Sequence, residues 1–195
     1  MKVLGISGSP RAGGNTDTLL RAFLEGAAHE GAETEMVFLR DYAIHPCIGC
    51  ERCRKDLTCT RFLDGMHLLY PKIEEAVGVI LGSPTYNYNI TPQMKAFIDR
   101  LYPYYRFSEE RPGPYSSFFQ GLERKALVFS VAEQTKPEER GFAIEAMQRP
   151  LEALGLEVTD TLPAEGYFTK KAVAGDSAVQ EKARDAGRRF ARGLI

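Results

Sequence analysis

Apolar runs of five to seven residues recur along the chain, separated by longer stretches with helical spacing. They lie at 2–7, 35–39, 77–83, 125–131 and 156–162. Runs that are apolar along most of their length are typical of strands buried on both faces of a parallel sheet. The pattern therefore predicts five such strands.

Between these runs, apolar residues three and four positions apart indicate helices. The expected helices cover 16–30, 92–101, 138–154 and 176–193, and we expect Pro150 to bend or interrupt the third of them. Strict alternation of strand and helix implies right-handed crossovers and therefore a doubly wound α/β sandwich. In such a sheet, ligands bind beyond the carboxyl ends of the strands, where we expect the loops 7–15, 40–65 and 83–91 to meet.

Length and charge narrow the class of protein. The 195 residues fit a single domain, 1–195, and a net charge of −1 provides no global field to attract nucleic acid or a membrane surface. The apolar opening stretch is too short for a signal peptide, and no run reaches the about 20 apolar residues of a membrane helix. We therefore expect a cytoplasmic protein, in which clustered cysteines are more often metal ligands or redox groups than disulfides.

The loop after the first strand, GSPRAGGNT at 8–16, is rich in glycine and hydroxyl residues. Its glycines let backbone N–H groups converge, and the helix that follows adds partial positive charge at its N-terminus. Further hydrogen-bond donors and one full charge come from Ser9, Arg11, Asn15, Thr16 and Thr18. The loop lacks the Lys-Ser/Thr pair of a nucleoside-triphosphate loop and the spacing of the dinucleotide fingerprint. The pattern favours a phosphate monoester over an ordinary glycine-rich turn.

The loop after the third strand lies within GSPTYNYNITPQMKAFIDR at 82–100. Tyr86 and Tyr88 offer aromatic faces, and the asparagines and backbone amides can bond the polar edge of a heterocycle. By itself the segment equally suits a tight loop with two core tyrosines. A phosphate loop on the adjacent strand favours a platform for a flat ring.

All four cysteines fall within PCIGCERCRKDLTC, the Cys-rich loop at 46–59, as Cys47, Cys50, Cys53 and Cys59. Their spacing, C-x2-C-x2-C-x5-C, suits three irons of one cubane cluster with the fourth ligand nearby. Zinc sites usually pair two C-x2-C turns across a longer stretch. A zinc site and uncoordinated packing or redox thiols remain as alternatives. His45 and His67 flank the loop and are expected at the surface or as caps rather than as ligands.

The blocks GISGSPRAGGNT and GVILGSPTYNYNITPQMKAFIDR resemble the NADPH-dependent FMN reductase family of flavodoxin-like proteins. The resemblance covers most of residues 1–105 and implies a five-stranded sheet of order 2-1-3-4-5 that binds FMN. It assigns the FMN phosphate to Ser9, Arg11, Asn15 and Thr16. It assigns the isoalloxazine ring to Pro84, Thr85, Tyr86, Asn87 and Tyr88, with SVAEQ at 130–134 as a further wall.

The cysteine spacing resembles the iron-sulfur flavoprotein branch of this group. That resemblance implies a 4Fe-4S cluster held by the four cysteines beside FMN. It also implies that a ferredoxin-like donor passes electrons to the cluster and that a small acceptor receives them. No acid–base constellation stands out, so no catalytic side chain is expected. The alternatives are an NAD(P)H-dependent FMN or quinone reductase without a cluster, and a non-enzymatic electron carrier or thiol sensor.

The aromatic insertion at 102–119 carries seven of the 20 aromatic residues. Such density between turn residues suits either the base of the core or a subunit interface. We expect a homodimer or homotetramer in which this insertion covers a neighbour's flavin.

Overall fold

A parallel five-stranded sheet organises the computed structural model, which describes residues 1–194. Its strands are β1 (Lys2–Ser7), β2 (Glu33–Phe38), β3 (Gly78–Pro84), β6 (Lys125–Val131) and β7 (Glu157–Ala164). Their order, β2-β1-β3-β6-β7, confirms the predicted flavodoxin-like order. Each of the five apolar runs forms one strand, with bounds displaced by at most two residues.

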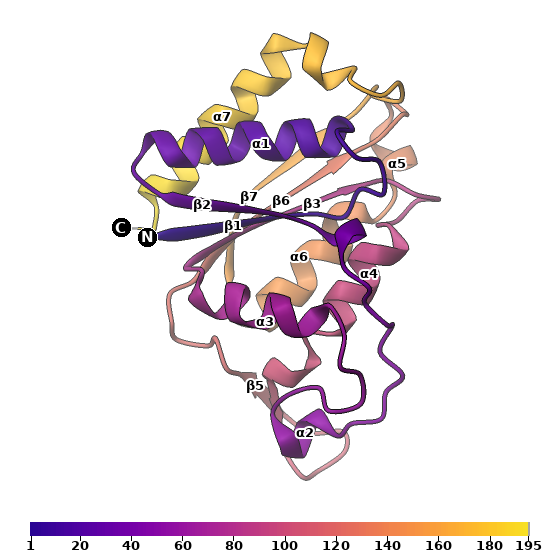
Figure 1. Ribbon diagram of the computed structural model, residues 1–195, viewed down its shortest axis with the longest axis vertical. Helices are drawn as coiled ribbons and strands as arrows, with labels where there is room; N and C mark the ends of the chain where they lie inside the picture. Colours follow the sequence, from indigo (N-terminus) through magenta and orange to yellow (C-terminus); the bar gives the residue numbers. More distant parts are fainter. Residues whose placement is uncertain (195) are drawn as a thin grey trace.

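Helices cover both faces of the sheet. On one face lie α1 (Asn15–His29) and α7 (Ser177–Arg192). On the other lie α3 (Met66–Glu75), α4 (Pro92–Asp99) and α6 (Ala143–Ala153) (Figure 1). Short 3-10 turns occur at η1 (Leu39–Asp41) and η3 (Val173–Gly175). Each face buries its own apolar cluster, so the sheet separates two hydrophobic cores and contributes side chains to both.

The helices α1 and α7 meet at their backbones. A Cβ atom at Gly26 would lie 2.1 Å from the carbonyl oxygen of Arg184, and one at Gly187 would lie 2.0 Å from that of Phe23. Only glycine permits such an approach at these two positions, because any side chain would overlap the opposing backbone. This contact seats the last helix directly on the first.

The segment 138–154 departs from the expected single helix. The structure breaks it at Gly141, whose φ of 62° is left-handed, into α5 (Pro137–Arg140) and α6. Pro150 lies inside α6 without ending it. The break follows the residue that accepts positive φ rather than the one that lacks an N–H group.

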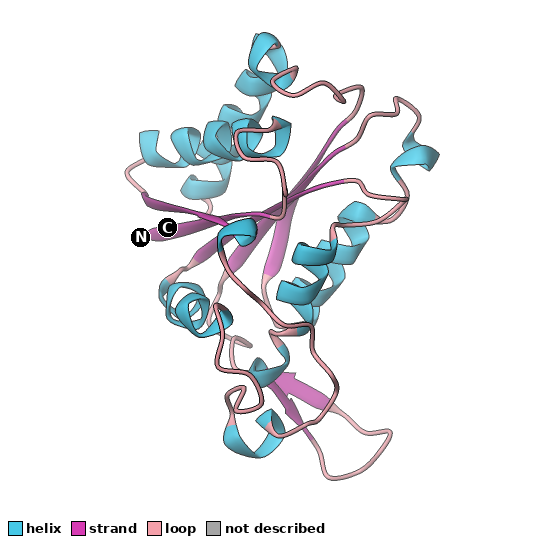
Figure 2. Ribbon diagram, turned by 45° about the vertical axis from the view of Figure 1, so that its right-hand side comes forward, coloured by secondary structure: helices cyan, strands magenta, loops and turns pink. Residues whose placement is uncertain are grey.

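A smaller unit hangs below the main sheet and contains the Cys-rich loop. It comprises α2 (Cys53–Asp56), the turn η2 (Tyr102–Tyr104) and a hairpin of β4 (Tyr105–Phe107) and β5 (Tyr115–Ser117) (Figure 2). The aromatic insertion is thus divided: Tyr104 and Phe119 are buried, whereas Tyr115 and Phe118 are about half exposed. Among residues 1–194, no helix has the length and apolar character needed to cross a membrane.

We predict that Gly187→Ala destabilises the protein by about 2 kcal/mol, because the added methyl group forces α7 away from α1. The free energy of unfolding in urea measures the effect. Gly175→Ala is the matched control, since a Cβ atom there meets nothing within 4 Å. Equal stability of the two variants would contradict the close packing of the helices.

Candidate functional site

Two cavities lie at opposite ends of α4. The larger, here the edge cavity, has a volume of about 370 Å³ and opens at the carboxyl ends of the strands. Its lining comes from the four loops that follow β1, β3, β6 and β7. The smaller, here the thiol cavity, has a volume of about 120 Å³ and is lined by residues from 47–62 and 99–103. A helix of eight residues such as α4 is about 12 Å long.

A buried ion pair shapes the loop after β1. Asp17, in the first turn of α1, accepts hydrogen bonds from the Ser7 hydroxyl at 2.6 Å and the Gly13 N–H at 2.8 Å. Arg40 approaches the same carboxylate, with Nη2 3.0 Å from Oδ2, and donates to the Ser9 carbonyl at 3.1 Å. Because this network holds both ends of the loop, Arg40 and Asp17 fix its shape from beneath.

Two of the side chains that were assigned to the FMN phosphate form hydrogen bonds with other parts of the protein. The Asn15 amide donates to the Thr169 carbonyl at 3.0 Å and accepts from the Val173 N–H at 3.2 Å. Arg11 donates to the Phe168 carbonyl at 3.3 Å and lies over the Phe168 ring. Both side chains thereby join the loop after β1 to the loop after β7, and both residues line the edge cavity.

The start of α1 offers backbone donors to the same cavity. Gly14 is its N-cap, and in the described chain no side chain caps this first turn. Helix N-termini leave N–H groups without intrahelical acceptors, and these carry partial positive charge. Ser9, Gly14 and Thr16 all line the edge cavity, so this end of the cavity provides hydroxyl and amide donors.

The loop after β3 forms the facing wall with Pro84, Thr85, Tyr86 and Asn87. The buried Thr85 hydroxyl has no partner within residues 1–194. Tyr88 differs from its neighbours: it is 58% exposed and does not line the cavity. Here the chain makes a left-handed turn, with φ of 46° at Asn87 and 66° at Tyr88, and the Tyr88 carbonyl accepts a hydrogen bond at 2.8 Å from the N–H group of Phe142, between α5 and α6.

Sequence reasoning missed part of the edge cavity. The additional lining residues are Val131, Glu133, Tyr167, Phe168 and Lys170. The first two fall within 130–134, where a further wall was expected. The other three follow β7, where the exposed aromatic residue Phe168 was the available signal. Asp17 and Arg40 were missed because nothing local in the sequence pairs residues 23 positions apart.

All four cysteines line the thiol cavity. Their thiols are free; Cys47 and Cys50 are exposed, whereas Cys53 and Cys59 are partly buried. Burial, and then the charges of the other three thiols, raise the pKa of Cys53 to about 11. Within residues 1–194, no three Cys, His, Asp or Glu side chains group closely enough to hold a metal ion. The structure thus brings the four thiols to one cavity without gathering them around a point.

Arg100 and Asp64 anchor the start of the Cys-rich loop. Their side chains are 2% and 4% exposed and form a two-pronged ion pair, at 2.8 and 3.1 Å. Arg100 also donates to the His45 carbonyl, and Asp64 accepts from the His45 N–H, both at 2.9 Å. Burial opposes ionisation of Asp64, but the bonds from Arg100 and two backbone N–H groups outweigh it and lower its pKa to about 2.

The far end and the underside of the Cys-rich loop have their own supports. The His67 imidazole bonds the Cys59 carbonyl at 2.9 Å, which gives this histidine a structural contact with the loop. Arg54 donates to the Ser108 carbonyl at 2.8 Å and lies over the Phe107 ring. The aromatic hairpin is therefore the base on which the Cys-rich loop rests.

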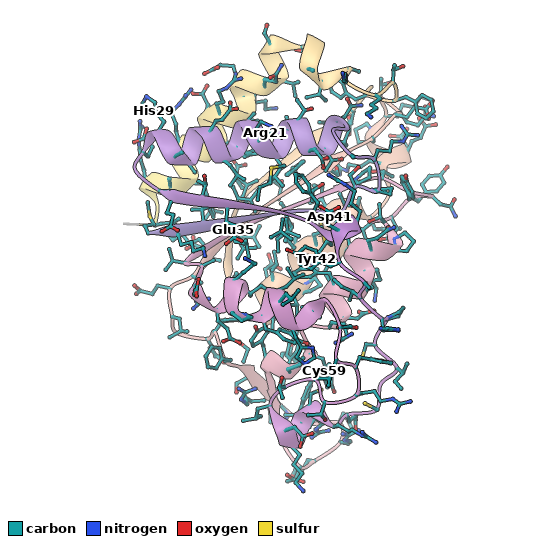
Figure 3. All side chains as sticks on the ribbon, viewed as in Figure 1. Arg21, His29, Glu35, Asp41, Tyr42 and Cys59 are labelled. Atoms are coloured by element: carbon teal, nitrogen blue, oxygen red, sulfur yellow. The ribbon has the colours of Figure 1, made fainter. Side chains whose placement is uncertain are left out.

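The expectation that the Cys-rich loop shares the ligand edge of the sheet is wrong. After Asp41 the chain runs past α4 instead of folding over the strand ends, and Figure 3 shows Cys59 far below Asp41. The physical reason is the Arg100–Asp64 pair, which holds the chain at the carboxyl end of α4. The two cavities have no lining residue in common.

A doubly wound parallel sheet, with a donor-rich first loop facing a third-strand loop across one cavity, defines a flavodoxin-like protein. Residues 1–122 match the model of a family described as NADPH-dependent FMN reductase, and the chain belongs to that family.

Curated relatives support the branch suggested by the cysteine spacing. The chain is 46% identical over 103 residues to an iron-sulfur flavoprotein of Methanocaldococcus jannaschii, covering 53% of each chain. It is 41% identical over 100 residues to one of Methanosarcina thermophila, covering 51% of this chain and 52% of the relative. The chain thus spans about half the length of the curated relatives it matches.

Solved structures share the fold. A flavone reductase superposes with a TM-score of 0.74 at 20% identity, over 100% of this chain and 63% of that protein. An azoreductase from Bacillus anthracis superposes with a TM-score of 0.72 at 17% identity, over 97% and 100%. At such identities the likeness is one of fold alone.

The raised pKa of Cys53 predicts slow, strongly pH-dependent alkylation in the reduced, metal-free protein. Only the thiolate reacts, so the rate at Cys53 should rise about tenfold per pH unit from pH 8 to pH 10. Iodoacetamide labelling followed by peptide mass spectrometry measures it, with exposed Cys50 as the internal reference. A rate at Cys53 that levels off below pH 9 would contradict the burial of this thiol.

Proposed function

We propose that the protein is an FMN-containing iron-sulfur flavoprotein, an oxidoreductase that relays electrons between a one-electron donor and a small acceptor. The observation that carries this proposal is the pair of cavities at the two ends of α4. One offers donors and an aromatic wall, and the other offers four thiols. We further propose that residues 1–195 form one domain, with the Cys-rich loop 46–59 and the aromatic insertion 102–119 as its additions.

The chemistry of the edge cavity fits FMN. The phosphate would lie at Ser9, Arg11, Asn15 and Thr16, where hydroxyls, backbone N–H groups and the helix N-terminus suit an anion. Since the Asn15 and Arg11 side chains bond the loop after β7, we propose that they act mainly by holding that loop against the phosphate site.

The ring would lie along Pro84, Thr85, Tyr86 and Asn87. The unpartnered, buried Thr85 hydroxyl supports a polar guest at this wall. Tyr88, outside the cavity, would lie at its rim. FMN supplies the redox chemistry when bound, and the protein supplies position and exclusion of water.

The donor set of the thiol cavity fits a 4Fe-4S cluster. Cys47, Cys50, Cys53 and Cys59 would each bind one iron, because cubane clusters take four thiolates. The cavity has a volume of about 120 Å³ and its thiols are spread over the lining. This arrangement suits a multi-atom cluster, which fills space between its ligands, better than a single metal ion. Such a cluster passes single electrons, whereas FMN accepts them singly or in pairs, so together they match one-electron and two-electron reactants.

The surfaces near the two cavities support the partners we propose. Exposed Arg52 and Lys55 lie within the Cys-rich loop and exposed Arg61 lies just after it, and these cations suit an acidic, ferredoxin-like donor. Exposed aromatic residues, among them Tyr115 and Phe118 on the insertion, suit an interface in a homodimer or homotetramer.

An NAD(P)H-dependent FMN or quinone reductase without a cluster is the second candidate. The description of the family, NADPH-dependent FMN reductase, favours it. Steady oxidation of NADPH by a protein that contains FMN but negligible iron and sulfide would select this candidate. A zinc content of about one per chain would instead assign the thiols to a structural site.

We predict that anaerobically purified protein is brown and contains one FMN and about four irons and four sulfides per chain. Cys53→Ala should abolish iron uptake and leave FMN bound, because Cys53 lies outside the edge cavity. Metal, sulfide and flavin analysis measures both.

Light scattering of the same sample should give at least twice the mass of one chain, and a monomeric mass would contradict the proposed assembly.

We also predict that Tyr86→Ala weakens FMN binding about fivefold or more, because an aromatic wall contributes about 1 kcal/mol or more to holding a flat ring. Tyr88→Ala is the matched control: the same residue type, two positions away and outside the cavity, should leave the affinity within about twofold of wild type. Titration by flavin fluorescence gives both dissociation constants. Equal losses in the two variants would argue against the edge cavity as the flavin site.

A further inference from the structure

Arg100 is buried although it carries a full positive charge. It follows the last residue of α4, has 2% of its surface exposed, and lines the thiol cavity together with all four cysteines. Burying a cation is unfavourable unless its charge and its N–H groups are satisfied. The position of Arg100 therefore requires a reason beyond packing.

Not all of its donors have acceptors. A guanidinium group has five N–H bonds. Nη1 donates to the His45 carbonyl and to Asp64 Oδ2, and Nη2 donates to Asp64 Oδ1. The Nε atom is buried and has no partner within residues 1–194. A buried charged donor of this kind needs an acceptor, and the thiol cavity is the space that Arg100 lines.

Arg100 interacts electrostatically with the thiol cavity through Cys59. Burial acts to lower the pKa of Arg100, but the hydrogen bond with Asp64 and the charge interactions with Tyr70, Cys59 and Asp64 outweigh burial and raise it. Phe62 covers the guanidinium at 5.4 Å. The environment of Arg100 is therefore dry, and in such surroundings a charge acts more strongly than it would in water.

We infer that Arg100 is a positioning residue for an anionic, sulfur-bearing group in the thiol cavity: its Nε–H donates to a sulfur there, and its charge favours the more negative state. This inference rests on the proposed function, in which the group is an iron-sulfur cluster. Uptake of one electron makes a cluster more negative by one charge. A neighbouring cation and an N–H···S bond both stabilise that reduced state, which raises the reduction potential.

Four proteins test the inference: the wild type, Asp64→Asn, Arg100→Met, and the double variant. Asp64→Asn leaves the guanidinium without its counter-charge and should raise the potential of the cluster. Arg100→Met removes the cation and leaves a buried carboxylate, so the potential should fall. The double variant restores the net charge of the pair but not the Nε–H group, so its potential should lie between those of wild type and Arg100→Met.

The measurement is an anaerobic titration with dithionite as electron donor, followed by electron paramagnetic resonance of the cluster. Loss of stability alone would not order the four potentials in this way. If the double variant had the same reduction potential as the wild type, the proposed hydrogen bond from Nε would be overturned. Equal potentials in all four proteins would overturn the role of Arg100 altogether.

A second readout needs no cluster. In the reduced, iron-free chain, Cys59 is alkylated with anionic iodoacetate and with neutral iodoacetamide, and the ratio of the two rates is taken. Both reagents react with the same Cys59 thiolate, so the fraction of ionised thiol cancels in the ratio. The ratio therefore reports the electrostatic potential at Cys59, which attracts or repels only the anionic reagent. It should be highest in Asp64→Asn and lowest in Arg100→Met, whereas an unchanged ratio would overturn the inference. If the wild type takes up no iron or sulfide, the proposed function fails, and this ratio alone decides the role of Arg100.

Discussion

The anchoring of α4 at both ends is the constraint on which the arrangement of the two cavities depends. At its start, the Thr91 hydroxyl donates to the Gly8 carbonyl at 2.7 Å and accepts from the Met94 N–H at 3.2 Å, so one side chain caps the helix and holds the loop after β1. At its end, Arg100 binds Asp64 and the His45 carbonyl. A helix is stiff over this length, and the spacing of the cavities is therefore fixed by eight residues of backbone.

Much of the fold follows from local patterns in the sequence. The run at 125–131 has only one structure open to it in a covered parallel sheet, and it forms β6 with the expected bounds. The break at Gly141 was missed because Glu138, Glu139 and Arg140 before it are good helix formers that give no sign of an end, whereas the backbone angle that ends α5 depends on the close approach of Gly141 to Tyr88.

The candidate site was less accessible from sequence, because contacts distant in the chain decide it. Loop chemistry identified Ser9, Thr16 and the segment 84–87, all of which line the edge cavity. It did not reveal that the Asn15 amide would bond residues more than 150 positions away. Nor did it reveal the path of the Cys-rich loop, since the ion pair that directs it joins residues 36 positions apart.

The clamp between Asn15 and the loop after β7 has a consequence for biosynthesis. Every residue that lines the thiol cavity has been synthesised once position 103 is translated, whereas the edge cavity lacks part of its wall until position 170 is translated. Because chains are made from the N-terminus at a finite rate, the lining of the thiol cavity is synthesised before that of the edge cavity. The edge cavity therefore receives the last part of its lining, Tyr167, Phe168 and Lys170, about 65 residues after the thiol cavity has its own.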